Sequence, residues 1–193
     1  MADKSENSND HEQVSEIRQM PNLWIRKMLT IVDAWDLDKD GCVGYADAMK
    51  IVDKFIKVGK SSDNLIACYR DAFKHTSDNP DAGAATATSM PKQLMEVWRT
   101  KDNPVIGNRI HGMYSDMFKT IDFNATGFLT FDQYLVFWNV FNLDKRFAKM
   151  QFDYMDTDHD GKISEEEFVN GFLDYRANPE DTLNRFYGPL INY

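Results

Sequence analysis

The chain has 193 residues, of which 42% are hydrophobic and 13% aromatic, so it is long and apolar enough to bury a core as one domain or two packed lobes. A formal net charge of −9 disfavours nucleic acid and anionic membrane surfaces as partners. Two cysteines without a CxxC pair, a polar N-terminus without a signal-peptide core and the lack of any run of eighteen apolar residues predict a cytoplasmic protein with no membrane span.

The first half of the chain shows helical periodicity around one acidic segment. After a polar tail over residues 1–20, apolar residues at spacings near 3.6 predict a helix from Pro21 that stops at "DLDKDG", and the periodicity resumes from Ala48 to Phe55. The next elements are a third helix, a small polar loop and a fourth helix, expected over 62–75, 76–90 and 91–100.

The second half repeats this scheme around two further acidic segments. One pair of helical patterns flanks "DFNATG" and another flanks "DTDHDG". The loop starts, Asp122 and Asp156, are 34 residues apart, which indicates an internal helix–loop–helix repeat. Four such units fit the chain, over residues 22–58, 63–100, 106–142 and 144–177.

The segment "DTDHDGKISEEE" has the ligand pattern of an EF-hand calcium loop. Such a loop supplies oxygens from positions 1, 3, 5, 7 and 9 and a bidentate carboxylate from position 12, around a turn with glycine at position 6. Gly161 occupies the turn, and Ser164 at position 9 ligates directly or through water. The other predicted ligands are the side chains of Asp156, Asp158 and Asp160, the Lys162 carbonyl and the side chain of Glu167.

The segment "DLDKDGCVGYAD" is a second predicted metal loop with two differences. Gly44 at position 9 has no side-chain oxygen, and the aspartate at position 12 is one methylene shorter than glutamate, so it reaches an ion less readily with both oxygens. Because a six-coordinate shell suits magnesium, we expect this loop to exchange Ca²⁺ and Mg²⁺. Its predicted ligands are Asp36, Asp38, Asp40, the Cys42 carbonyl and Asp47.

The other two units lack a complete ligand set. In "DFNATGFLTFDQ" the ligand positions 1, 3, 5 and 12 hold one anion instead of four, since they are occupied by Asp122, Asn124, Thr126 and Gln133. The sequence leaves open whether this loop binds metal. It predicts that the loop supports its neighbour structurally, with Leu129 opposite Ile163. No twelve-residue window in the second unit has the ligand order, so that unit is expected to be a pseudo-hand.

Other residue types point to packing rather than to catalysis. Of the ten methionines, Met28, Met113, Met117 and Met155 fall at helical core spacing, which favours a core over an exposed target-binding groove. Phe118, Ile121, Tyr134, Phe137 and Trp138 are expected to form the core face of the third unit. The sequence holds no Ser–His–Asp or Cys–His arrangement and no phosphate-binding loop, so no enzymatic activity is predicted.

The chain resembles the invertebrate sarcoplasmic calcium-binding proteins. The resemblance rests on the "NLWIRKM" helix before a first loop closed by Asp47, a degenerate second hand, the 34-residue offset of the last two loops, and the ending "NPEDTLNRFYGPLINY". It implies a compact four-hand fold whose C-terminal segment folds back into the protein. Related families are calexcitin, the coelenterazine-binding proteins and the calcium-triggered photoproteins, some of which enclose coelenterazine. The chain departs from all of them at Gln133, because their third hand is usually active.

These observations predict a compact all-α protein of two EF-hand pairs. The expected divisions are a flexible tail over 1–20, an N-terminal pair over 21–102, a C-terminal pair over 103–178 and a C-terminal tail over 179–193, packed back on the core. The predicted function is cytosolic Ca²⁺ and Mg²⁺ buffering through hands 1 and 4, with about two calcium sites and Mg²⁺ competing at hand 1. Two alternatives remain open: a calcium sensor that exposes apolar surface to a protein target, and a carrier of a hydrophobic small molecule such as coelenterazine.

Overall fold

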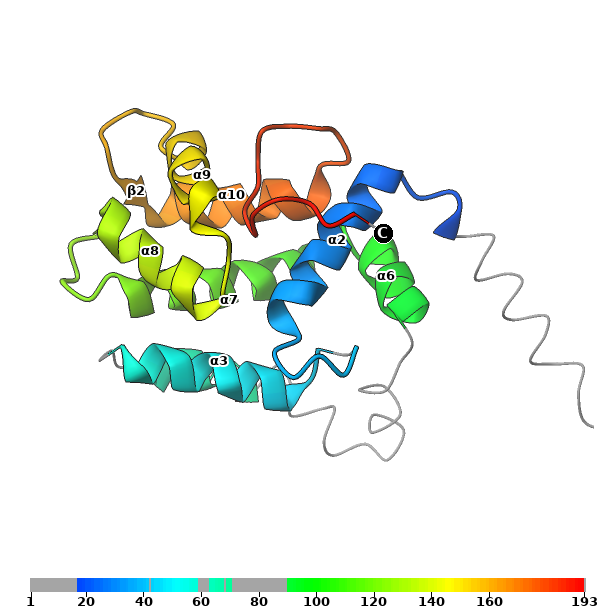
Figure 1. Cartoon of the computed structure of the whole chain (residues 1–193), viewed down its shortest axis with the longest axis horizontal. Coiled ribbons are helices and arrows are strands. Elements are labelled where there is room, and N and C mark those ends of the chain that lie inside the picture. Colours follow the sequence, from blue (N-terminus) through cyan, green and yellow to red (C-terminus); the bar gives the residue numbers. More distant parts are fainter. Residues whose placement is uncertain (1–16, 42, 59–62, 68, 71–89, 193) are drawn as a thin grey trace, which may run out of the picture.

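The computed structural model describes residues 17–41, 43–58, 63–67, 69–70 and 90–192. The described chain is mostly helical (Figure 1). In this view α8, α9 and α10 lie together at one end, while α2 and α6 lie at the other. Among the described helices, none is long and apolar enough to cross a membrane.

The first helix–loop–helix unit forms as the periodicity predicts. Helix α2 (Asn22–Trp35) ends at the first acidic loop, and α3 (Tyr45–Lys57) begins after it. The carboxylate of Asp47, in the first turn of α3, accepts a hydrogen bond from the Gly44 N–H, which satisfies a backbone donor that the helix start would leave unpaired. Residues 63–67 and 69–70 are helical, within the expected third helix, whereas its remainder and the expected loop lie outside the described residues.

The second half begins with α6 (Met90–Arg99) and α7 (Pro104–Ile121). Asn103 caps α7 by accepting a hydrogen bond from the Val105 N–H at 2.9 Å, and Pro104 takes the first helical position, where no amide hydrogen is needed. Then follow α8 (Phe131–Val140), the short 3₁₀ helix η1 (Lys145–Phe147), α9 (Ala148–Met155) and α10 (Glu165–Ala177). Helices therefore flank both acidic loops of this half, as predicted.

Two short strands join the loops of the third and fourth units. Strand β1 (Phe128–Leu129) pairs antiparallel with β2 (Ile163–Ser164), and Leu129 lies directly opposite Ile163. Both side chains are fully buried. This pairing confirms the expectation that the third loop supports the fourth. In the first unit the same loop position is occupied by Val43, whereas the loop of the second unit lies outside the described residues.

Aromatic side chains dominate the core of the C-terminal half. The five residues predicted for the core face of the third unit, Phe118, Ile121, Tyr134, Phe137 and Trp138, are all buried. Of the four methionines predicted for the core, Met28, Met117 and Met155 are buried, whereas Met113 is half-buried and lines a cavity described below. The methionines therefore serve mainly as core residues.

The C-terminal segment after α10 returns across the molecule and packs against it, as the family resemblance implies (Figure 1). Phe186 and Tyr187 are buried in the aromatic core. The Lys27 ammonium of α2 donates to the carbonyls of Asn178 and Glu180, each at 2.9 Å, and burial lowers its pKa. Because α2 also packs on α10, and α3 on α8, the segment reinforces a contact between the two halves of the chain.

Candidate metal centres and an apolar cavity

The first, third and fourth loops share one backbone conformation. Position 4 has positive φ in each loop, at Lys39 (61°), Ala125 (50°) and His159 (60°). Position 6 has φ between 80° and 89°, at Gly41, Gly127 and Gly161, a region that glycine enters without steric cost. The third loop is thus an EF-hand loop in its backbone, even though its ligand set is incomplete.

The aspartate at position 1 holds this turn in the same way in all three loops. Its two carboxylate oxygens accept hydrogen bonds from the backbone N–H groups of positions 5 and 6. The N···O distances are 3.2 and 2.9 Å at Asp36, 3.1 and 2.7 Å at Asp122, and 3.0 and 3.0 Å at Asp156. All three aspartates are buried. The first ligand position is therefore preorganised in each loop.

The fourth loop gathers its acidic side chains around the turn. Carboxylate oxygens of Asp156, Asp158 and Glu167 all lie within 4.8 Å of one another, while the Asp160 carboxylate accepts from the Lys162 N–H at 2.8 Å. Glu167 accepts from the backbone N–H and hydroxyl of Ser164 with one oxygen and from those of Thr157 with the other. Burial alone would raise the pKa of Glu167, but these hydrogen bonds outweigh it and the pKa is lowered. The donor set and its spacing fit a calcium ion.

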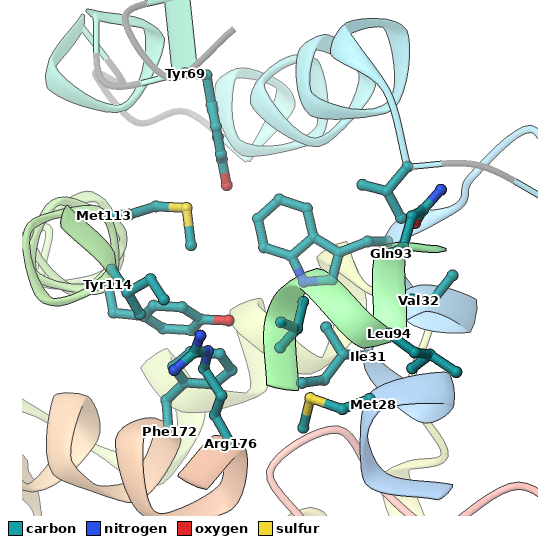
Figure 2. Close-up of a pocket in the computed structure, with 14 residues that line it drawn as sticks. Met28, Ile31, Val32, Tyr69, Gln93, Leu94, Met113, Tyr114, Phe172 and Arg176 are labelled. Atoms are coloured by element: carbon teal, nitrogen blue, oxygen red, sulfur yellow. The ribbon is translucent and has the colours of Figure 1, made fainter. Parts of the chain in front are cut away.

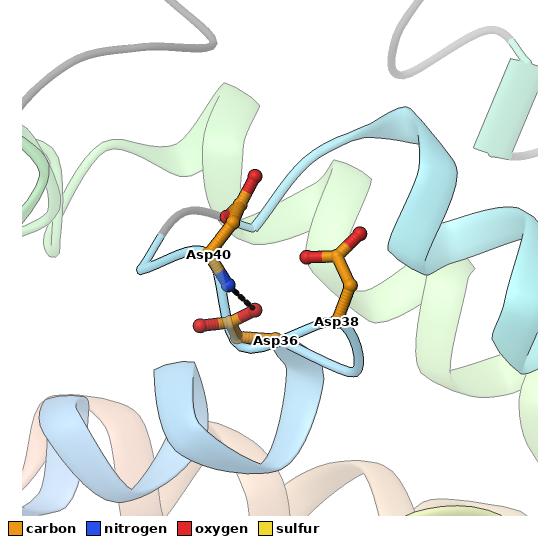
Figure 3. Close-up of side chains that lie close together, drawn as sticks. All are labelled: Asp36, Asp38 and Asp40. Atoms are coloured by element: carbon orange, nitrogen blue, oxygen red, sulfur yellow. Dashed lines mark hydrogen bonds between the residues drawn. The ribbon is translucent and has the colours of Figure 1, made fainter.

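The first loop brings Asp36, Asp38 and Asp40 together, with carboxylate oxygens within 4.8 Å of one another (Figure 3). Asp47 at position 12 is buried and turned onto the backbone. One of its oxygens accepts from the Leu37 N–H at 2.9 Å, and the other accepts from the Gly44 N–H at 3.0 Å. Its position parallels that of Glu167 in the fourth loop. The Cys42 carbonyl, predicted at position 7, lies outside the described residues.

A lysine that the loop pattern does not predict lies at the first metal loop. The Lys50 ammonium, one turn into α3, pairs with the Asp38 carboxylate at 2.7 Å. This hydrogen bond lowers the pKa of Asp38 and raises that of Lys50. A cation supplied by the protein therefore contacts one of the predicted ligands, and a metal ion must compete with it. The sequence signal is the i,i+3 spacing of Lys50 from Asp47, which places both on one face of the helix.

Side chains at two ligand positions of the third loop bond to the loop itself. The Thr126 hydroxyl at position 5 donates to the Phe128 carbonyl at position 7, with an O···O distance of 3.0 Å. The buried Gln133 oxygen accepts from the Thr130 N–H at 3.0 Å, so its amide nitrogen is the group left for the loop interior. That nitrogen has no hydrogen-bond partner among the described residues. An amide donor in the place of a carboxylate oxygen disfavours a cation.

A cavity of about 320 Å³ lies between the two halves of the chain (Figure 2). It is lined by side chains of α2, α6, α7 and α10, together with Val43 of the first loop and Tyr69. The lining is mostly apolar, and the polar groups of Trp35 and Tyr114 are bonded to the C-terminal segment. The Trp35 indole donates to the Tyr187 hydroxyl at 2.8 Å, which in turn lies 2.5 Å from the Tyr114 hydroxyl. Arg176 of α10 also faces the cavity.

The fold and the loops agree with the similarities of this chain to known proteins. A family model described as EF hand matches residues 147–173. Two proteins named sarcoplasmic calcium-binding protein, from Hediste diversicolor and Perinereis vancaurica tetradentata, are each 28% identical to the chain, and each match covers 88% of this chain and 99% of the relative. The resemblance expected from the loops and the C-terminal segment is confirmed by these relatives.

Solved structures with the same fold include a coelenterazine-binding protein and apo-aequorin. The calcium-loaded apo form of a coelenterazine-binding protein from Renilla muelleri is 21% identical, with a TM-score of 0.56 over 86% of this chain and 96% of that one. Calcium-loaded apo-aequorin from Aequorea victoria is 15% identical, with a TM-score of 0.65 over 82% of this chain and 92% of that one. These likenesses establish a compact all-α fold of EF-hand type.

Proposed function

We propose that this chain is a cytosolic calcium buffer that binds divalent cations in its first and fourth loops. The observation that carries the proposal is the pair of carboxylate clusters, Asp36 with Asp38 and Asp40, and Asp156 with Asp158 and Glu167, each held around an EF-hand turn. Similarity to sarcoplasmic calcium-binding proteins over most of the chain supports the same function. The ligands are those predicted from the sequence: in the first loop Asp36, Asp38, Asp40, Cys42 and Asp47, and in the fourth Asp156, Asp158, Asp160, Lys162 and Glu167.

We further propose that Mg²⁺ competes with Ca²⁺ at the first loop. Asp47 is shorter than glutamate and Gly44 offers no side-chain oxygen, so this loop supplies fewer oxygens than the fourth. Calcium needs six to eight oxygens, whereas magnesium takes six and retains several waters. The Lys50 ion pair with Asp38 is a further cost to any ion that enters. The fourth loop is therefore the stronger calcium site in this proposal.

Calorimetric titration of the full chain with Ca²⁺, with and without Mg²⁺, tests the proposal. We expect about two calcium sites, one of them weakened by Mg²⁺. Glu167→Gln should remove the site that Mg²⁺ does not weaken, while Glu166→Gln, at the exposed neighbouring position, serves as the control. Asp47→Asn should remove the other site, with the exposed Asp53 changed to Asn as its control. Three tight calcium sites in the unmodified chain would refute the assignment of the third loop.

The apolar cavity favours a second function, that of a carrier for an apolar small molecule. Its volume of about 320 Å³ lies within the range of ligand pockets, about 300 to 1,000 Å³. Coelenterazine is the first compound to test, because one structural neighbour is a coelenterazine-binding protein. Addition of coelenterazine should quench tryptophan fluorescence if it enters the cavity, because Trp35 lines it. Fluorescence equal to that of an inner-filter control would exclude it as the ligand.

The sensor alternative requires apolar surface that is exposed by calcium. The methionines predicted for the core are mostly buried, so they do not form a target-binding groove in this conformation. A buffer should bind little of the dye ANS with or without calcium, since its apolar side chains stay in the core. A large calcium-induced increase in ANS fluorescence would favour the sensor instead.

A further inference from the structure

The cavity between the two halves contains a buried cation. Arg176 on α10 is 6% exposed and lines the cavity beside Tyr114 and Phe172 (Figure 2). A guanidinium has five N–H donors and stays charged in proteins. The Arg176 guanidinium makes one hydrogen bond to another described residue, from one terminal nitrogen to the Lys101 carbonyl at 3.1 Å. Most of its donor capacity is therefore not used by the described part of the protein.

No acidic side chain among the described residues forms an ion pair with Arg176. Asp102, whose carboxylate has an electrostatic effect on Arg176, is largely exposed and paired with Lys101. Burial lowers the pKa of Arg176 because the site disfavours a charged group. Buried charges are normally paired, since removing an isolated charge from water is costly. A carboxylate matches the planar fork of a guanidinium with two parallel hydrogen bonds.

The rest of the cavity wall is suited to a hydrocarbon chain. Ile31, Leu94, Met113 and Phe172 present apolar side chains to the space, and the hydroxyl of Tyr114 is already paired with Tyr187. Gln93 and Tyr69 are the other polar side chains of the lining (Figure 2). A volume of about 320 Å³ is at the small end of ligand pockets, which leaves room for one chain of roughly ten carbons. Charge and shape together therefore describe an amphipathic acid.

We propose that this cavity binds an apolar monocarboxylate, with its hydrocarbon chain between α2, α6 and α7 and its carboxylate on the Arg176 guanidinium. This inference rests on the carrier function proposed above and specifies the class of its ligand. It is independent of calcium buffering, which involves none of these side chains as metal ligands.

The test compares two probes of equal chain length, decanoate and 1-decanol, on the full chain at neutral pH, with binding measured by calorimetry and by Trp fluorescence. We expect decanoate to bind at least about tenfold more tightly than decanol, because hydrogen bonds to a charged group are among the stronger ones. Arg176→Met should remove this preference while decanol binding changes less than about twofold. Arg109→Met, at an exposed position of α7, is the matched control and should retain the preference.

A variant that fills the cavity tests whether both probes bind there. Met113→Trp should fill the cavity and weaken both probes, while near-ultraviolet circular dichroism confirms that each variant is folded. Equal binding of the two probes to the unmodified chain would overturn the role of Arg176 and leave the carrier function standing. If decanoate, decanol and coelenterazine all fail to bind, both the ligand class and the carrier function are overturned. An unchanged preference in a folded Arg176→Met variant would also refute the proposal.

Discussion

Replacing Gln133 by Glu should convert the third loop into a metal site. The loop already has the EF-hand backbone, with positive φ at Ala125 and Gly127, and its first aspartate is held like those of the other two loops. The Gln133 oxygen is used by the Thr130 N–H, so an amide nitrogen is left for the interior. A glutamate can accept the same hydrogen bond with one oxygen, as Glu167 does from the Ser164 N–H in the fourth loop, and its second oxygen adds a carboxylate ligand for an ion.

The expected gain follows from the charge added next to the ion. A unit negative charge about 2.4 Å from a divalent cation gains about 3.5 kcal/mol at the dielectric constant of water. Desolvation of the carboxylate and the loss of the hydrogen bond between Thr126 and Phe128 oppose this gain. We therefore expect a net strengthening of about 1.4 to 2.8 kcal/mol, which corresponds to about ten- to hundredfold in affinity.

Calorimetric titration with calcium measures the change directly. Gln133→Glu should add a third site or strengthen a weak one, while the sites of the first and fourth loops keep their affinities. Asn139→Asp adds the same charge at an exposed position of the same helix and should have little effect. If Gln133→Glu produces no gain, the side chains of Asn124 and Thr126 are the greater defect and the reasoning from position 12 is wrong.

Three other changes test the first loop, the C-terminal segment and the buried tyrosines. Lys50→Gln should strengthen metal binding at the first loop by about two- to fivefold, because it frees Asp38. Lys57→Gln, on the same helix, removes the same charge and should not strengthen it. Equal effects of the two changes in a calcium titration would show that only net charge matters. Phe186→Ala should lower the free energy of unfolding, measured in urea, by about 3 to 5 kcal/mol, because this ring is fully buried among Tyr114, Phe137 and Phe168. A loss below about 1 kcal/mol would mean that the C-terminal segment is not part of the core. Burial raises the pKa values of four tyrosines, so folding stability should be complete below about pH 10 and fall as pH rises above it, because the unfolded chain releases phenolic protons that the folded chain retains. Tyrosinate absorbance and circular dichroism, followed together as pH rises, test this prediction. The buried tyrosines should ionise only as the chain unfolds; they are Tyr114, Tyr134, Tyr175 and Tyr187. Their ionisation in the folded state would contradict the prediction.

Apolar spacing and the repeated loop pattern predicted most of the fold, because burial of apolar side chains and loop pairing also form it. The helix limits around the acidic loops follow from apolar spacing, and the pairing of Leu129 with Ile163 follows from their equal place in two repeated loops. The return of the C-terminal segment was predicted through the family resemblance, since its residues have no helical or strand periodicity of their own. The structure then shows what holds it: Phe186 and Tyr187 in the core, and Lys27 bonded to its backbone.

The features that the sequence did not predict depend on contacts between distant residues or on side-chain orientation. Lys50 reaches Asp38 across the loop, and no ligand pattern includes a cation at that position. The orientation of the Gln133 amide depends on its bond to Thr130, which only the folded loop shows. Arg176 follows an ordinary charged pattern near the end of a helix, and its burial results from the packing of α10 against α2 and α7. The role of a residue was thus predictable where its local sequence context decided that role.

The internal bonds of the third loop give it a structural role that does not need an ion. Both oxygens of Asp122 accept from the loop backbone, and the Thr126 hydroxyl bonds the carbonyl that would otherwise face a metal. These bonds need no ion, so we expect strand β1 to keep its conformation without calcium and, through Leu129, to present an ordered partner to Ile163 of the fourth loop. A loop whose partner is already ordered pays less of the entropic cost of ordering when it binds. The loss of ligands in the third loop is thus compatible with strong binding in the fourth, because the strand pairing requires the apolar residue at position 8 and not the carboxylate at position 12.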